Sequence, residues 1–75
     1  MIYNRIAVFR TEQNISRQEL ADKVGVNFQT IGFIERGDYS PSLELAFKIA
    51  EIFEVDLTDV FSDQPFTRLI ERKTR

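Results

Sequence analysis

The chain has 75 residues, of which 43% are hydrophobic and 29% charged, with three Gly and two Pro. This composition indicates one small globular domain, because a disordered chain would hold fewer apolar residues and a collagen-like chain far more Gly and Pro. The formal net charge is −2, and the sequence has no Cys and no His. Disulfides, thiolate zinc sites, thiol catalysis and the usual general base are therefore excluded, so we expect no enzyme activity, no cofactor and no metal.

The distribution of apolar and charged residues limits which partners the protein can have. No apolar run approaches the roughly 18 residues that span a bilayer, and residues 1–5 do not resemble a signal peptide, so we expect a cytoplasmic protein with no membrane contact. Residues 1–40 are neutral, residues 41–63 carry a net charge of −5, and residues 64–75 carry +3. A nucleic acid, if it is the partner, should therefore contact the first half of the chain, with help from the tail.

Apolar spacing and a capping pattern predict two helices in the first third of the chain. Ile2, Ile6 and Phe9 recur at intervals of four and three residues, which predicts a helix over residues 4–13. Ser16 is followed three residues later by Glu19, and such a capping box predicts the start of a second helix, over residues 17–24.

A short turn separates this second helix from a third. Gly25 can take the left-handed conformation that ends a helix, and Asn27 is a favourable N-cap for the next one. The third helix should carry Ile31 and Ile34 on its inner side and close at Gly37.

The second half of the chain predicts two more helices. Ser40 and Pro41 have the residue types of an N-cap and a first helical position, and they should begin a central, buried helix over residues 42–53. Asp56 should cap a short helix over residues 57–61. Five helices with short joints predict an all-α orthogonal bundle over residues 1–62, followed by a C-terminal extension over residues 63–75.

The second and third predicted helices have the pattern of a helix-turn-helix. Small Ala21 allows a close crossing, Gly25 makes the turn, Val26 fills the angle and Ile31 seals the core side. Such a unit leaves the N-terminal end of its second helix protruding, at a diameter that fits the major groove of DNA.

These residues also carry a resemblance to a known family. The chain resembles the Cro/phage-repressor helix-turn-helix family, also called the xenobiotic-response-element family, over residues 4–61. The matching segments are Asn4-Arg5-Ile6, Phe9-Arg10, residues 15–21, Gly25-Val26, residues 29–31, residues 34–37, residues 41–46 and residues 48–50. The resemblance implies a lambda-repressor-like fold and a sequence-specific transcriptional regulator, usually dimeric, that docks its third helix in the major groove.

The resemblance also implies which residues contact DNA. Arg17 and Gln18 lie where phosphate contacts are expected. The base-reading positions hold Asn27, Phe28, Gln29 and Thr30, and the outward face continues with Gly32, Phe33 and Arg36. Gln29 is the strongest candidate, because its amide can pair with adenine N6 and N7. Arg10 and Glu35 match a recurring family pair, which implies an ion pair that fixes the third helix.

Phe28, Gly32 and Phe33 depart from the family pattern. The family often has polar readers where Phe28 and Phe33 stand, and Gly32 costs about 1 kcal/mol relative to Ala within a helix. One interpretation is that Phe28 packs on a thymine methyl group while Gly32 lets the helix lie close to the groove floor. A second is that one Phe packs back against the neighbouring helix and Gly32 is merely tolerated. A third is that the aromatic pair marks a protein-binding face.

The leading hypothesis is a repressor that binds a pseudo-palindromic operator in double-stranded DNA as a homodimer. The alternative is a protein-interaction or antitoxin-like module on the same fold, and we expect no small-molecule effector. The residues expected at the dimer interface are Val60, Phe61, Phe66, Leu69 and Ile70. We expect Phe66 and its neighbours to be extended and to pair with Ile2-Tyr3; otherwise residues 64–75 are a disordered tail and any dimer uses the fifth helix alone.

Overall fold

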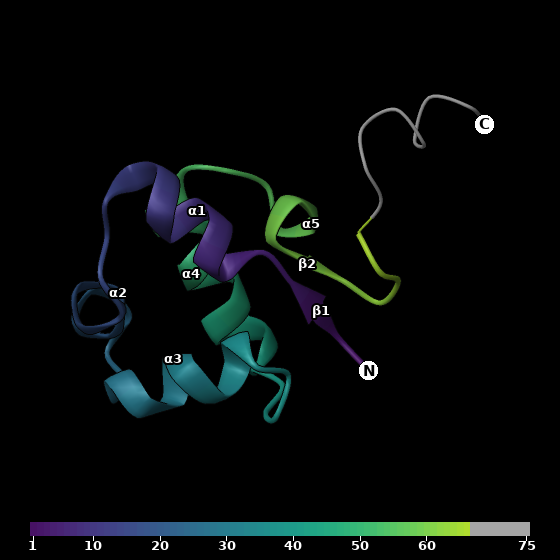
Figure 1. Ribbon diagram of the computed structural model, residues 1–75, viewed down its shortest axis with the longest axis horizontal. Coiled ribbons are helices and arrows are strands. Elements are labelled where there is room, and N and C mark those ends of the chain that lie inside the picture. The colour runs from purple at the N-terminus through teal and green to yellow at the C-terminus, as the bar shows by residue number, and fades with distance from the viewer. Residues whose placement is uncertain (67–75) are drawn as a thin grey trace.

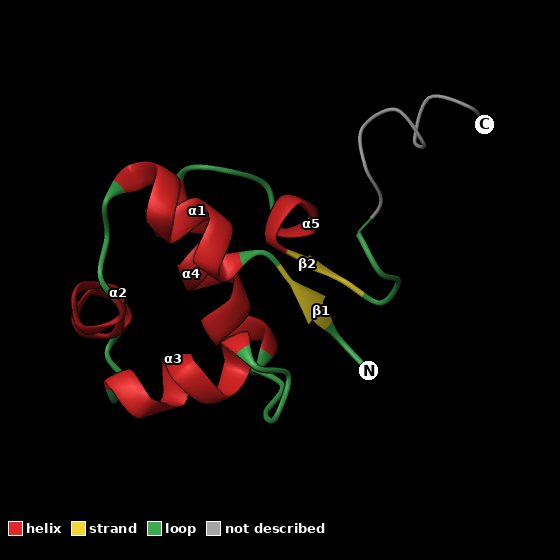
Figure 2. Ribbon diagram, viewed as in Figure 1, coloured by secondary structure: helices red, strands yellow, loops and turns green. Residues whose placement is uncertain are grey.

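Five helices bracketed by two short strands make up residues 1–66, the part of the chain that the computed structural model describes (Figure 1). In chain order they are β1 (Tyr3–Asn4), α1 (Ile6–Gln13), α2 (Arg17–Val24), α3 (Phe28–Glu35), α4 (Leu43–Phe53), α5 (Leu57–Val60) and β2 (Phe61–Ser62). The predicted five-helix bundle is confirmed, and the small sheet is an addition to it (Figure 2). No helix within residues 1–66 is long and apolar enough to cross a membrane.

Side-chain caps begin α2 and α3 where the sequence predicts them. The Ser16 hydroxyl accepts a hydrogen bond from the Glu19 backbone N–H at 3.0 Å, and the Glu19 carboxylate accepts one from the Ser16 N–H at 3.0 Å. Asn27 Oδ1 accepts from the Gln29 N–H at 2.7 Å. Each bond satisfies a backbone donor that has no partner inside its helix, so both start points are set locally.

The start of α4 differs from the prediction. The N-cap is Ser42, whose hydroxyl accepts from the Leu45 N–H at 3.1 Å, rather than Ser40. Because an N-cap side chain satisfies an N–H two or three residues after it, Ser42 suits a helix that begins at Leu43. Pro41 therefore precedes the helix and is not its first residue.

One hydrophobic core joins all five helices, with α4 at its centre. Figure 1 shows α1 and α3 on either side of α4. The buried residues are Ile6, Leu20, Ala21, Val24, Ile31, Ile34, Ala46, Ile49, Ala50, Phe53, Val60 and Phe61. On α4, however, Leu43 and Phe47 are 67% and 54% exposed, so this helix is buried along one face and not around most of its circumference.

The sheet pairs the two ends of the described chain. It is antiparallel, with Tyr3 opposite Ser62 and Asn4 opposite Phe61. The expected pairing of the N-terminal segment with the residues around Phe66 is therefore wrong, because β2 follows α5 directly. Phe66 instead lies against the Arg5 guanidinium, 4.3 Å from the ring centre. Since residues 3 and 4 form a strand, α1 begins at Ile6 and not at residue 4.

The last helix and strand change the expected dimer surface. Val60 is fully buried and Phe61 is 8% exposed, so both side chains belong to the core and offer little surface to a partner. This corrects the expectation that they are free to form an interface. Leu69 and Ile70 lie outside the described residues.

Two helices end on a residue other than glycine in the left-handed conformation. Asn14 after α1 has φ 56° and Glu54 after α4 has φ 61°. A side chain with a Cβ is disfavoured in this conformation by about 1–2 kcal/mol, although asparagine tolerates it better than glutamate. Glu54 is therefore a local source of strain.

We expect Glu54→Gly to raise the free energy of unfolding by about 1 kcal/mol, because glycine adopts the left-handed conformation without steric conflict. The matched control is Glu51→Gly, which also removes an exposed carboxylate but places the glycine within α4. It should lower the free energy of unfolding by about 1 kcal/mol. Urea unfolding of both variants measures the two changes. Equal effects of the two substitutions would contradict the strain at Glu54.

Candidate nucleic-acid interface

α2, α3 and the turn between them form a helix-turn-helix. Ala21 is fully buried where α2 meets α3, and its carbonyl accepts hydrogen bonds from the Gly25 and Val26 N–H groups at 2.8 and 3.0 Å. Gly25 makes the turn at φ 80°. Ile31 and Ile34 hold α3 to the core, so the opposite face of α3 points outward, at the edge of the molecule (Figure 1).

A hollow of about 360 Å³ lies on this outward face. It is lined by Arg17, Phe28, Gln29, Gly32, Phe33 and Arg36. These are six of the nine residues predicted to contact DNA, and the fold brings them together from α2, α3 and the end of α3.

The other three predicted contact residues do not line the hollow. Asn27 uses its side-chain oxygen to cap α3. Thr30 is partly buried, and the Gln18 amide donates to Asp22 Oδ1 at 2.9 Å. Gln18 remains exposed on the first turn of α2, where a phosphate contact is expected.

Gly32 forms the floor of the hollow and is not an exposed residue as the sequence suggested. It is buried, and a Cβ placed on it would meet Arg36 Nη1 at 3.4 Å, an ordinary contact distance. The aromatic rings beside it stay accessible, because Phe28 is 47% and Phe33 46% exposed. About half of each ring is therefore open to a ligand.

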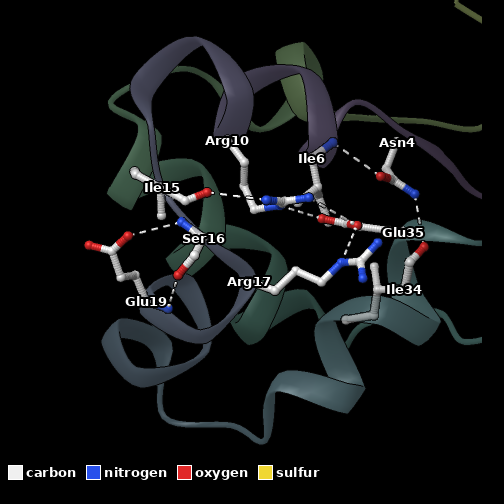
Figure 3. A network of polar contacts seen from close by, with 9 residues as sticks. All are labelled: Asn4, Ile6, Arg10, Ile15, Ser16, Arg17, Glu19, Ile34 and Glu35. Carbon is white, nitrogen blue, oxygen red and sulfur yellow. Dashed lines mark hydrogen bonds and ion pairs between the residues drawn. The ribbon is translucent and has the colours of Figure 1, made fainter.

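A carboxylate at the end of α3 is held by arginines from two other helices (Figure 3). Arg10 Nε of α1 donates to Glu35 Oε2 at 2.7 Å, which confirms the predicted ion pair. Arg17 Nε of α2 donates to Glu35 Oε1 at 2.9 Å, a contact that the sequence analysis missed. The Glu35 side chain is only 6% exposed, so both bonds act on a carboxylate largely removed from water.

Two further bonds extend this network, one between α1 and the segment before α2 and one from β1 to the end of α3. Arg10 Nη1 donates to the Ile15 carbonyl at 3.2 Å, at the entry to α2. Asn4 Nδ2 of β1 donates to the Ile34 carbonyl at 2.9 Å (Figure 3). The orientation of α3 is therefore set by side chains from β1, α1 and α2.

Both arginines at the hollow are already paired with carboxylates of this chain. Besides Arg17 with Glu35, Arg36 Nε donates to Asp38 Oδ2 at 3.2 Å, and its guanidinium lies 5.1 Å from the centre of the Phe33 ring. Within residues 1–66 these carboxylate bonds use Nε, which leaves the terminal amino groups to donate to a ligand. The pairing weakens the positive field at the hollow but fixes where each guanidinium stands.

The packing of α2 against α3, the glycine turn and the outward face of α3 define a helix-turn-helix domain. The model of the helix-turn-helix family matches residues 6–60, and the chain belongs to this family, in its Cro/C1-type branch of DNA-binding transcription regulators.

Similar proteins agree with this assignment. The chain is 49% identical, over 76% of its length and 80% of the relative, to an uncharacterised HTH-type transcriptional regulator of Archaeoglobus fulgidus. It is 32% identical, over 84% of its length and 57% of the relative, to the cryptic phage CTXphi transcriptional repressor RstR of Vibrio cholerae. The crystal structure of a Bacteroides fragilis protein with a proposed DNA-binding function superposes with a TM-score of 0.75 at 31% identity, covering 83% of this chain and all of that one.

The two arginines that pair with Glu35 should contribute unequally to stability. Arg10→Ala should lower the free energy of unfolding by about 3 kcal/mol, because the Arg10 side chain is 17% exposed and its loss leaves a nearly buried carboxylate undercompensated. Arg17→Ala should cost less than about 1 kcal/mol, because the Arg17 side chain is 48% exposed. Double-mutant cycles in urea with Glu35→Ala measure the two coupling energies. Equal couplings, or none for Arg10, would contradict this division.

Proposed function

We propose that this protein is a sequence-specific transcriptional repressor that acts in the cytoplasm and binds a pseudo-palindromic operator as a homodimer. The observation that carries the proposal is the outward face of α3, where Gln29, the two phenylalanines and two arginines surround one hollow. Membership of a family of transcription regulators supports DNA as the ligand, and the similarity to a phage repressor supports repression.

The proposed docking places α3 in the major groove and the start of α2 against the backbone. Gln29 is exposed on the first turn of α3. Its amide NH2 can donate to adenine N7 while its amide oxygen accepts from the adenine N6 amino group, and this bidentate pair fixes the orientation of the amide. Arg17 begins α2, beside the hollow, and suits a phosphate contact. When Arg17 turns towards a phosphate, Arg10 still compensates Glu35.

A dimer follows from the small size of this face. One helix-turn-helix makes few phosphate and base contacts, and a two-fold dimer doubles them while placing its α3 helices about 34 Å apart, one turn of DNA. The surface that we propose for it lies at the sheet, where a second hollow of about 310 Å³ is lined by residues that include Met1, Ile2, Pro65 and Phe66. Met1 is 86% and Ile2 38% exposed, so an apolar surface is available there. Gly37, just after α3, also lines this hollow, so a two-fold axis there would bring the two α3 helices to the same side.

Gln29 and Arg17 should affect binding differently. On a duplex selected from a random pool, Gln29→Ala should cost about 1–3 kcal/mol and relax the preference at one base pair, because it removes a base contact. Arg17→Ala should weaken all sequences alike and reduce the slope of log K against log salt by roughly one, because it removes a phosphate contact. Fluorescence anisotropy at several salt concentrations measures both.

The control for charge alone is Lys48→Ala, which removes an exposed cation of α4 that lies outside the hollow. It should leave base preference and salt slope unchanged. The proposed docking would have to be abandoned if both Gln29→Ala and Arg17→Ala bound the selected duplex like the unaltered protein.

The dimer surface is tested by shortening the chain. A chain ending at Ser62 keeps β2 and the core but lacks Pro65 and Phe66, together with Leu69 and Ile70. We expect the full chain to sediment as a dimer at micromolar concentration and the shortened chain as a monomer. A monomeric full chain would contradict the dimer, and a shortened chain that remains dimeric would contradict the contribution of the C-terminal residues.

A further inference from the structure

We infer that the hollow on α3 recognises the 5-methyl group of thymine, with Phe28 and Phe33 as its walls and Gly32 as its floor. The inference rests on the proposed function and deepens it, because it names the chemical group of the operator that this site reads.

The walls of the hollow are apolar and accessible on the one face where a base reader is expected to be polar. Phe28 and Phe33 are 47% and 46% exposed, and both line the hollow. Neither ring can donate or accept the hydrogen bonds that base edges offer. Their exposed area gains free energy only when another apolar group removes it from water.

A glycine stands between the two aromatic residues of the hollow. Gly32 lies one helical turn after Phe28 and directly before Phe33 and also lines the hollow, and a Cβ placed on it would meet Arg36 Nη1 at 3.4 Å. The Phe33 ring is held in place by the Arg36 guanidinium at 5.1 Å, which Asp38 fixes in turn through a 3.2 Å ion pair. The wall is therefore preorganised before DNA arrives.

Among the four bases, thymine alone presents an apolar group in the major groove. The other major-groove groups are hydrogen-bond donors, acceptors or bare ring C–H groups, and only the C5-methyl of thymine projects an apolar group that matches an aromatic pocket. Gln29 lines the same hollow and suits adenine. The hollow as a whole therefore fits a step that contains A·T pairs.

The test replaces thymidine by deoxyuridine, which removes the methyl group and leaves every hydrogen-bonding group unchanged. A duplex is first selected from a random pool with the full chain, and each thymidine of one half-site is then replaced singly. We expect one or two positions at which the loss of the methyl weakens binding about three- to tenfold, as the burial of one methyl group implies. Replacement elsewhere should change the dissociation constant by less than about twofold.

The protein variants show whether the hollow causes the preference for thymidine at the sensitive position. The quantity compared is the ratio of the dissociation constants of the deoxyuridine and thymidine duplexes. Phe28→Ala, Phe33→Ala and Gly32→Ala should each bring this ratio towards one, the first two by removing a wall and the third by adding a methyl group against the Arg36 guanidinium that holds Phe33. Phe47→Ala is the matched control, because Phe47 is 54% exposed on α4 and does not line the hollow; it should keep the ratio. Because the ratio is taken within one variant, a general loss of affinity or stability cancels.

The outcomes separate this inference from the proposed function. If a duplex is selected but deoxyuridine has no effect at any position, or if the ratio survives in both the Phe28 and the Phe33 variants, thymine reading by the hollow is overturned while DNA binding stands. If no duplex is enriched over the random pool, the proposed function fails and the inference fails with it.

Discussion

The orientation of α3 depends on one nearly buried carboxylate. Glu35 stands at the end of this helix, 6% exposed, and receives Arg10 from α1 and Arg17 from α2. A carboxylate removed from water in this way is costly unless it is paired and hydrogen-bonded, so the helices must keep the relative positions that pair it. The short ion pairs from two directions therefore add a directional restraint on α3 to the packing of Ile31 and Ile34 in the core.

The two arginines also differ in what they can do besides holding Glu35. Arg10 is largely enclosed and gives a further bond to the Ile15 carbonyl, so it is committed to the structure. Arg17 reaches the same carboxylate from the rim and is half exposed. A phosphate could therefore bind Arg17 while Arg10 keeps Glu35 paired. Any polyanion that binds here must compete with Glu35 for Arg17 and with Asp38 for Arg36. An internal competitor of this kind lowers non-specific affinity more than it lowers the affinity of a ligand that also fits the hollow.

Most of the helices could be predicted from the sequence because their ends are set locally. Ser16 with Glu19, Gly25, and Asn27 act on N–H and carbonyl groups within a few residues, and the structure confirms each. Ser40 and Ser42 carry the same capping group two residues apart, and only the position of the first free N–H of α4 decides between them. The strands gave no such signal, because two residues are too few to show an alternating pattern and their pairing depends on where α5 ends.

At the candidate site, the residues of α3 were predictable and their environment was not. The family resemblance placed Phe28, Gln29 and Phe33 on the outward face, and it also supplied the pairing of Arg10 with Glu35. The sequence could not show that Gly32 lies buried under Arg36 or that Arg17 pairs with Glu35. These two contacts depend on the side-chain conformations of Arg36 and Arg17. Val60 and Phe61 were misplaced for a related reason: apolar residues near a chain end fit a core and an interface equally well until the neighbouring strand is known.

The pairing of β1 with β2 has a consequence for the order in which the chain folds. The contacts between successive helices bring together residues close in sequence, whereas Tyr3 and Ser62 lie at opposite ends of the described chain. Closing so long a loop before the helices have assembled would cost much chain entropy for a ladder of two residues, so the strands should meet last, on a bundle already formed. Asn4 belongs to this late strand and also bonds the Ile34 carbonyl. The final step of folding would then be the one that secures the end of α3, so that a molecule with frayed ends would keep its core and lose the fixed orientation of this helix.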